Sequence, residues 1–352
     1  MSTGPFVITA WSTVSPFGIG REAFESGLRS GRTTVQGPEA PHGRPPQDKA
    51  CVVPDFDVRD VLGRKGTRSM DRVSGFAVTT AKELLHRLRE PAETGVVLGC
   101  TGAVQAMRDF TRTSLLAERP FYVDPSAVPN GVMNCAAGQT AIWHRLTGPN
   151  ATVATGRTSG LSALAYARRL LSHKRAGAVL AGAVEEYSSM RAWLEFRRDA
   201  SATPTPLGEG CVLYLVEQAH TASGAPLVEL LGVTSRVHPA GDVRSTLRSS
   251  LREELERHAV PPRRVWVACP SGAPGEHEAV ASVLGNDALG RAPSLAGVGE
   301  TGTASAAFQI AAILSLAGPP PGSVALVTSV DPGGLLSHAL LRFPASDAEH
   351  SA

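Results

Sequence analysis

Nucleophilic, redox or metal chemistry would first need the five cysteines and ten histidines of this 352-residue chain. The cysteines are scattered and form no Cys-x-x-Cys pair: they are Cys51, Cys100, Cys135, Cys211 and Cys269. An odd number of thiols beside small or apolar residues indicates reduced, mostly buried side chains rather than a disulfide framework. The histidines show no His-Glu-x-x-His or other ligand spacing, so we expect no metal site. No motif indicates a cofactor, and none is expected.

Two adjacent carboxylates, Glu185 and Glu186, follow a run that is typical of a strand. One interpretation is a paired acid site for proton transfer. We expect instead a surface-facing strand end.

The composition excludes several classes of protein. Hydrophobic residues make up 42% of the chain and charged residues 19%, so it can bury a large core and is not mostly disordered. The 34 Lys and Arg against 32 Asp and Glu give a net charge of +2, which does not favour a nucleic-acid partner or a membrane surface. No apolar run approaches the ~20 residues of a spanning helix. The start of the chain lacks a signal-peptide pattern, so we expect a cytoplasmic protein.

Short runs rich in Val and Leu alternate with longer runs of helical spacing, which predicts an α/β layered fold with both sheet faces covered. The expected strands are Phe6–Trp11, Gly95–Cys100, Ala151–Thr155, Ala178–Ala183, Cys211–Glu217, Leu227–Val233, Val265–Cys269, Val324–Ser329 and His338–Phe343. The expected helices are Arg21–Ser30, Ser69–Arg89, Met133–Leu146, Ser159–His173, Val243–His258, His277–Leu284 and Gly302–Leu316, with one more at about Val104–Leu115.

The order of elements repeats once along the chain. A strand ending at Cys100-Thr101-Gly102 precedes an Ala-rich helix from Ser159 and two further strands, and a strand ending at Cys269 precedes an Ala-rich helix from Gly302 and two strands. We therefore expect two duplicated halves, residues 1–220 and 221–352, packed as one double unit.

Several successive motifs resemble those of β-ketoacyl-ACP synthases. They are DFDVRDVLGRKGTRSMDRVSGFAVTTAKELL (55–85), VVLGCTG (96–102), VPNGVMNCAAGQTAIWHRLTGPNATVATG (128–156), SGLSALAYARRLL (159–171) and PLGEGCVLYLVE (206–217). The resemblance covers about Pro5 to Phe343 and is strongest in the first half. It implies a thiolase-like αβαβα layered sandwich made of two duplicated halves.

The residues of catalysis depart from that family's pattern. Its cysteine nucleophile corresponds to Arg157, in the run Thr155-Gly156-Arg157-Thr158, and a guanidinium cannot attack a thioester. Its two histidines correspond to Cys269 and Val298. Its lysine and gating phenylalanine correspond to Pro293 and Pro332, in Pro293-Ser294-Leu295 and Val330-Asp331-Pro332-Gly333-Gly334. Catalysis of condensation on this chain is therefore not expected.

Arg157 is expected to fill the altered pocket by pairing with a carboxylate such as Glu300. The alternative is that its guanidinium binds an acyl-carrier phosphate or a malonyl carboxylate.

The resemblance is to an inactive sister of the ketosynthase, the chain length factor or KSβ of type II polyketide synthases. It implies a heterodimer with an active ketosynthase (KSα), an acyl carrier protein as second partner, and a role in closing the end of the acyl tunnel. The tunnel and interface residues carried over are Val104, Met107, Phe110, Thr111, Asn134, Cys135 and Gly138. Small side chains at 104, 107 and 111 favour a long or reduced, polyene-like product.

Two other interpretations stay open. One is an independent acyltransferase or thioesterase that uses Cys269, although no histidine lies near it in the sequence to act as a base. The other is a homodimeric protein that binds acyl-ACP without chemistry.

Overall fold

One bent sheet organises the chain, seen here in a computed structural model that describes residues 4–37, 46–47, 49–119, 122–198, 205–239 and 242–345. Its strands are β1 (Phe6–Ser15), β2 (Gly18–Ile19), β5 (Gly95–Gly99), β6 (Asn150–Val153), β7 (Ala178–Glu185), β9 (Gly210–Gln218), β10 (Val228–Val237), β11 (Val265–Cys269), β12 (Val324–Val330) and β13 (Leu335–Arg342). A small second sheet contains β3 (Val35–Gln36), β4 (Ala50–Cys51) and β8 (Leu207–Gly208).

The strand order shows the duplication. The order is β6-β5-β7-β9-β1-β10-β13-β12-β11, with β2 paired to β1. Outward from the centre, β1, β9 and β7 are antiparallel and β5 is parallel to β7; β10, β13 and β12 are likewise antiparallel and β11 is parallel to β12. The strand β6, which is parallel to β5, has no counterpart in the second half of the sheet as the structure describes it.

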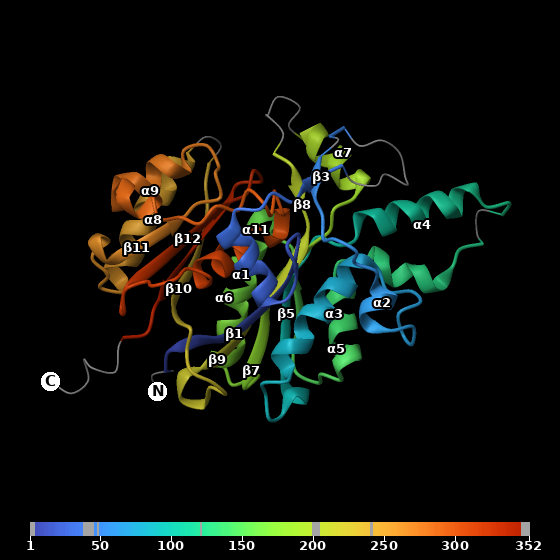
Figure 1. Ribbon diagram of the computed structural model, residues 1–352, viewed down its shortest axis with the longest axis horizontal. Coiled ribbons are helices and arrows are strands. Elements are labelled where there is room, and N and C mark those ends of the chain that lie inside the picture. The colour runs from blue at the N-terminus through green and yellow to red at the C-terminus, as the bar shows by residue number, and fades with distance from the viewer. Residues whose placement is uncertain are drawn as a thin grey trace.

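Helices fill the space between and outside the two halves of the sheet (Figure 1). The central helices α6 (Ser159–Ser172) and α11 (Ser305–Leu314) contact each other and pack against both halves. Outer helices α3 (Arg72–Leu85) and α5 (Cys135–His144) cover the first half, and α8 (Val243–Arg257) and α9 (Glu276–Leu284) cover the second. The layers confirm the predicted thiolase-like sandwich of two duplicated halves. The boundary between residues 220 and 221 stays a prediction.

The composition of the central helices explains their position. α11 reads SAAFQIAAIL without a charged residue, and eight of its ten residues are buried. α6 approaches it closely at Gly160, where an added Cβ would lie 3.0 Å from the amide nitrogen of Ala307. Small residues at this contact let the two helices share one layer.

Element boundaries differ from the expected ones where side chains cap or satisfy the backbone. α3 begins after Asp71, whose Oδ1 accepts from the amide of Ser74 at 2.8 Å, three residues later than predicted. β1 continues four residues beyond Trp11 to Ser15, and all ten of its residues are buried. The hydroxyl groups at the end of this strand can be buried because they have acceptors: Ser12 donates to Glu83 at 2.7 Å and Thr13 to the carbonyl of Cys211 at 2.8 Å.

The short elements were not predicted. Besides the small sheet and β2, they are the helices α2 (Val58–Leu62), α7 (Ser189–Arg198) and α10 (Asn286–Leu289), and the 3-10 turns η1 (Pro91–Glu93), η2 (Pro125–Gly131), η3 (Gly156–Thr158), η4 (Ala219–Thr221), η5 (Pro262–Arg264) and η6 (Gly302–Ala304). Most of these segments are too short to give a clear periodicity. The exceptions are α7, which has ten residues and was missed, and η6, which lies inside the predicted helix Gly302–Leu316. The helix α1 (Arg21–Ser30) was predicted with these limits.

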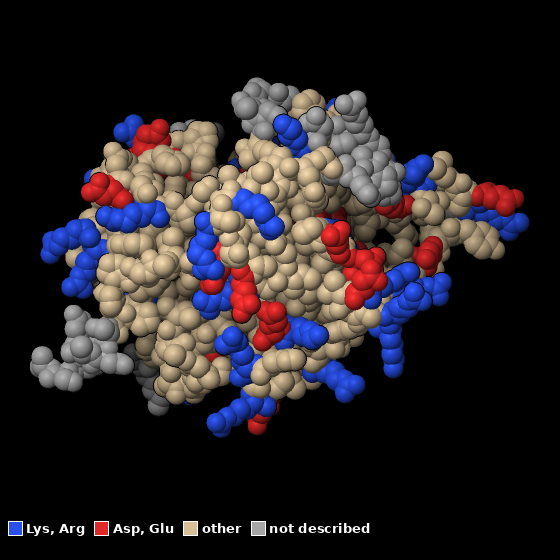
Figure 2. All heavy atoms as spheres, viewed as in Figure 1, with Lys and Arg blue, Asp and Glu red and all other residues tan. Residues whose placement is uncertain are grey.

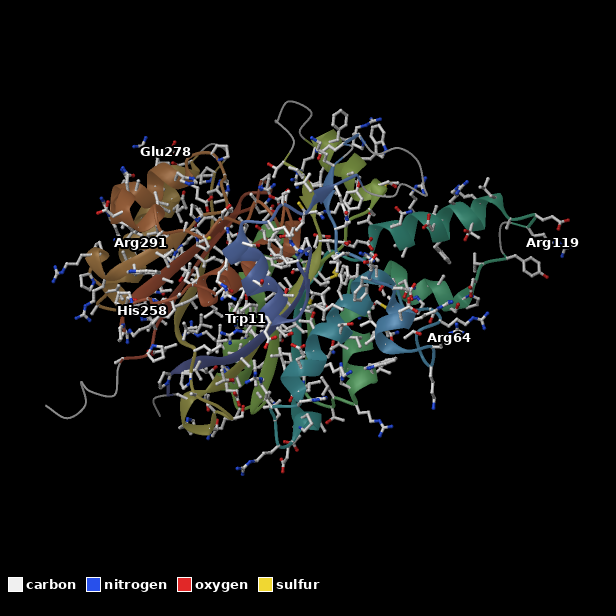
Figure 3. The ribbon with its side chains drawn as sticks, viewed as in Figure 1. Trp11, Arg64, Arg119, His258, Glu278 and Arg291 are labelled. Atoms are coloured by element: carbon white, nitrogen blue, oxygen red, sulfur yellow. The ribbon has the colours of Figure 1, made fainter. Side chains whose placement is uncertain are left out.

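Helix α4 (Val104–Leu116) and η2 extend away from the body (Figure 1), and we call this pair the arm. Figure 3 shows Arg119 at the outer tip of the arm and Arg64 below it. The exposed large apolar side chains of the arm and of the segment that leads into α5 are Met107, Leu115, Leu116, Val128, Val132 and Met133, and Ile142 is exposed in the last turn of α5. Figure 2 shows acidic and basic side chains of both signs around the rest of this face, in keeping with the small net charge.

Within the described residues, no helix is long and apolar enough to cross a membrane.

Candidate functional site

Arg157 lies in the turn η3, between β6 and the start of α6. The preceding Gly156 has φ +60°, a left-handed conformation that favours glycine. The Arg157 guanidinium forms an ion pair with Glu300, with Nη2 and Oε2 3.4 Å apart, and both side chains are about four-fifths buried, at 22% and 20% exposed. The structure thus forms the expected pair with Glu300, and no thiol or hydroxyl stands at position 157.

Asp331 also meets this turn, from the other half of the chain. Its Oδ2 accepts from the amide of Arg157 at 2.9 Å, and its Oδ1 accepts from the amide of Gly333 at 2.8 Å. Ser329 donates to the carbonyl oxygen of Arg157 at 3.0 Å. From the sequence, Asp331 was placed in a glycine-rich turn but was given no role. The signal was a carboxylate directly before Pro332, the residue that the resemblance places at the gating phenylalanine.

Cys269 ends β11 and is 4% exposed. Burial, with a smaller contribution from Glu276, raises the pKa of its thiol to about 12, so it is a poor source of thiolate. Glu276 is itself held by Ser271 at 2.8 Å and Thr328 at 2.6 Å. Cys269 therefore behaves as a small buried residue of the core.

The other positions that the resemblance places at catalytic residues do not form a cluster of reactive side chains. Val298 is fully buried in the central core cluster, Pro293 is half-buried before it, and Pro332 is exposed on its turn. Among the described residues, no group of three His, Cys, Asp or Glu side chains is placed to hold a metal ion. Below, the degenerate site means the five positions that the resemblance places at catalytic residues of the family, Arg157, Cys269, Pro293, Val298 and Pro332.

The expectation that Glu185 and Glu186 face the surface was wrong, because each is 5% exposed. Glu185 accepts from the amide of Thr303 at 3.1 Å and from its hydroxyl at 2.8 Å. Glu186 accepts from the amide of Gln105 at 3.2 Å, in the first turn of α4. Burial, followed by nearby carboxylates such as Asp71, raises the pKa of Glu186 to about 8, so this side chain is mostly protonated at pH 7.

Arg191 connects the base of the arm to the degenerate site and was missed by sequence reasoning. It is 4% exposed and donates to the carbonyl oxygens of Glu186 at 3.0 Å, Gly208 at 2.7 Å and Glu300 at 2.8 Å. It therefore ties together β7, the small sheet and the segment that carries the Arg157 partner.

The expected tunnel and interface residues lie together on the arm and the start of α5, apart from the degenerate site. On α4, Val104 and Phe110 are half-buried, whereas Met107 and Thr111 are exposed. On α5, the N-cap residue Asn134 is exposed, Cys135 and Gly138 are half-buried, and an added Cβ on Gly138 would meet no atom within 4 Å. Since η2 contacts both helices, these residues surround one exposed region.

The sequence family described as Beta-ketoacyl synthase, N-terminal domain, matches residues 4–222, more than half of the chain. The chain belongs to the β-ketoacyl synthase family. It is 28% identical over 246 residues to 3-oxoacyl-[acyl-carrier-protein] synthase 2 of Synechocystis, and 25% identical over 257 residues to the tetracenomycin polyketide synthase ketoacyl synthase alpha subunit of Streptomyces glaucescens. Each match covers 61% of this chain and 58% of the relative, so the chain spans less than two thirds of these curated relatives.

Solved structures agree with this family. The structure described as the ishigamide ketosynthase/chain length factor is 44% identical, with a TM-score of 0.91, and the match covers 97% of this chain and 100% of that one. A β-ketoacyl synthase from Burkholderia phymatum is 19% identical, with a TM-score of 0.77 and coverage of 97% and 99%. A chain of the complex described as AntDE:AntF, a type II polyketide synthase acyl carrier protein with its ketosynthase, is 18% identical. Its TM-score is 0.77, and the match covers 97% of this chain and 100% of that one. The last two show the shared fold.

Proposed function

We propose that this chain is a non-catalytic chain length factor (KSβ) of a type II polyketide synthase. It pairs with an active ketosynthase and closes the end of the tunnel that holds the growing acyl chain. An acyl carrier protein brings that chain to the pair. The partner supplies the nucleophile and the proton-transfer groups, and this chain supplies shape.

The observation that carries the proposal is the state of position 157. A ketosynthase needs a thiolate there to hold the acyl group, and this chain has a guanidinium fixed to Glu300 at 3.4 Å. The 44% identity to a structure named for both a ketosynthase and a chain length factor leaves two roles open. Arg157 favours the chain length factor, because an arginine cannot form an acyl-enzyme.

Two alternatives are less well supported. An acyltransferase or thioesterase using Cys269 would need a thiolate and a base, but the thiol is buried and its pKa is raised to about 12. A homodimeric acyl-ACP binding protein would use the same exposed arm to pair with a second copy of itself. The experiment below separates that case by the mass of the complex.

The proposed mechanism is steric. The arm and the start of α5 present an exposed apolar surface that a partner subunit would cover. The growing acyl chain would then end against Val104, Met107 and Thr111. Their short or flexible side chains leave a deeper tunnel than aromatic residues would. This favours a long or reduced, polyene-like acyl chain.

Co-expression with an active ketosynthase, followed by native mass spectrometry and product analysis, tests the proposal. We expect a one-to-one complex, and we expect Thr111→Phe to shorten the product by at least one extension cycle, because the added ring takes space at the tunnel end. Thr113→Phe is the matched control, since Thr113 is also an exposed threonine of α4 but points about half a turn away.

A stable homodimer that ignores the ketosynthase would contradict the proposal. If the complexes that contain Thr111→Phe and Thr113→Phe give products of equal length, Thr111 does not limit the tunnel. That result would leave the proposed heterodimer unaffected.

A further inference from the structure

We infer that Asp331 is a second and independent block to catalysis at the degenerate site. Its carboxylate accepts a hydrogen bond from the amide of residue 157, a backbone donor that an acyl-transfer site would need for its substrate. Asp331 with its bonds to the amides of Arg157 and Gly333 is called the latch below. The inference deepens the proposed function and rests on its claim that catalysis is lost, but not on pairing with a ketosynthase.

The first step is the geometry of the backbone donor. Acyl transfer needs N–H groups aimed at the oxygen that becomes negative, and the amide of the nucleophilic residue is often one of them. At position 157 this amide already donates to Asp331 Oδ2 at 2.9 Å. An incoming thioester oxygen would therefore find this donor taken by a charged acceptor, and charge-assisted bonds are the stronger ones.

The second step is that the latch is held in place from both sides. Asp331 Oδ1 accepts from the amide of Gly333 within its own turn, at 2.8 Å, and the amide of Asp331 donates to the carbonyl of Leu335 at 2.8 Å. On the other side, a Cβ on Gly156 would overlap the Asp331 carboxylate, so the turn and the carboxylate are packed together. Ser329, two residues earlier on β12, donates to the carbonyl of Arg157 at 3.0 Å.

The third step is charge. Glu300 lies 3.4 Å from the Arg157 guanidinium, so Arg157 is flanked by two carboxylates, one at its side chain and one at its amide. A cysteine introduced at position 157 would lose the guanidinium and keep both carboxylates. Nearby negative charge raises the pKa of a thiol, so restoring the cysteine alone should leave a weak nucleophile.

The test compares three variants of the full chain: Arg157→Cys alone, the same change with Asp331→Asn, and the same change with Asp331→Gly. Alkylation of the introduced thiol by iodoacetamide is followed against pH by peptide mass spectrometry, which separates it from the five natural cysteines. We expect the pKa of that thiol to be highest with Asp331 intact, lower with Asp331→Asn and lowest with Asp331→Gly. The Asp331→Gly double variant should react at least about tenfold faster at pH 7 than Arg157→Cys alone, which corresponds to one pKa unit.

The Asp331→Asn variant separates the effect of the negative charge from the effect of the hydrogen bond. Its side-chain oxygen can still accept from the backbone amide of residue 157, but it carries no charge. Equal pKa values and equal rates in all three variants would overturn the inference. If the variants with the introduced thiol do not fold, hydrogen exchange on the chain with Asp331→Gly alone tests the same contact. We expect the amide of Arg157 to lose protection, and unchanged protection there would also overturn the inference. Neither result depends on co-purification with a ketosynthase.

Discussion

At the scale of residues, three carboxyl side chains of this fold lie in different surroundings. Asp331 and Glu300 stand beside the charged Arg157, at its amide and at its guanidinium. Glu186 is buried and accepts a hydrogen bond from the neutral amide of Gln105. Burial therefore raises its pKa to about 8, and the side chain holds a proton at neutral pH.

A pH dependence follows for Glu186. The folded chain keeps this proton up to about pH 8, whereas the unfolded chain releases it near about pH 4.3. The stability that the protonated carboxyl contributes is fully present below the unfolded pKa and is lost as pH rises toward about 8. The slope is at most about 1.4 kcal/mol per pH unit. We expect Glu186→Gln, which stays neutral, to lose less thermal stability between pH 5 and pH 8 than the natural chain.

Thermal unfolding at several pH values measures this difference. Glu253→Gln, at a side chain 58% exposed, controls for the loss of one carboxylate at the surface. Parallel pH profiles for the natural chain and Glu186→Gln would show that Glu186 is not protonated in the folded chain.

At the scale of elements, Arg191 holds three segments that the sequence alone does not bring together. Its guanidinium reaches the end of β7 through Glu186, β8 through Gly208, and the segment before η6 through Glu300. Buried carbonyl groups need donors, and this one guanidinium donates to all three. The Arg191 side chain therefore connects the base of the arm with the surroundings of Arg157 through hydrogen bonds.

Replacing this side chain should be costly. We expect Arg191→Met, which keeps much of the volume, to lower the free energy of unfolding by about 3–5 kcal/mol. The carbonyls of Glu186 and Gly208 lose the guanidinium donor, and the carbonyl of Glu300 keeps only the bond from the amide of Gly208. Arg198→Met is the matched control on the same helix. Arg198 is 45% exposed and pairs with Glu195, so its loss should change stability by less than about 0.5 kcal/mol. Urea unfolding of both variants decides the matter, and similar midpoints would contradict a structural role for Arg191.

At the scale of the whole molecule, the apolar surface is unevenly distributed. The arm exposes Met107 and Leu116 at 46% and 71%, and the last turn of α5 exposes Ile142 at 73%, whereas most apolar side chains of the sheet and of the central helices are buried. Isolated folded chains rarely expose a contiguous apolar region of this kind without a partner. The proposed heterodimer would cover it, and β6, at the edge of the sheet, contacts α5 beside it.

A charge placed in this region should block assembly without harming the fold. We expect Ile142→Glu to weaken co-purification with a ketosynthase at least about a hundredfold, since the interface would bury an unpaired carboxylate. The melting temperature should stay close to that of the natural chain, because Ile142 is exposed.

Val237→Glu is the matched control for that change. Val237 is 78% exposed at the end of β10, in the second half and away from the arm. We expect the Val237→Glu variant to co-purify with a ketosynthase as well as the natural chain does. Normal pairing of Ile142→Glu, or equal loss in both variants, would move the interface elsewhere on the molecule.

Periodicity and local motifs by themselves determined a first set of features. The α/β layering and the limits of α1 follow from patterns within a few tens of residues, and the duplication follows from the same order of elements in the two halves. The placing of Arg157 at the nucleophile position is what the family resemblance implies. The pairing of Arg157 with Glu300 was also expected, because both residues stand in recognisable motifs of the two halves.

The tertiary structure decided what depends on contacts between distant segments. The placement of Asp331 at the amide of Arg157 joins residues 174 positions apart, and the burial of Glu185 and Glu186 follows from the segments that cover the end of β7. A strand end looks alike in sequence whether solvent or another segment lies over it. The physical reason is that burial, and with it protonation and hydrogen bonding, is a property of the packed chain and not of the local pattern.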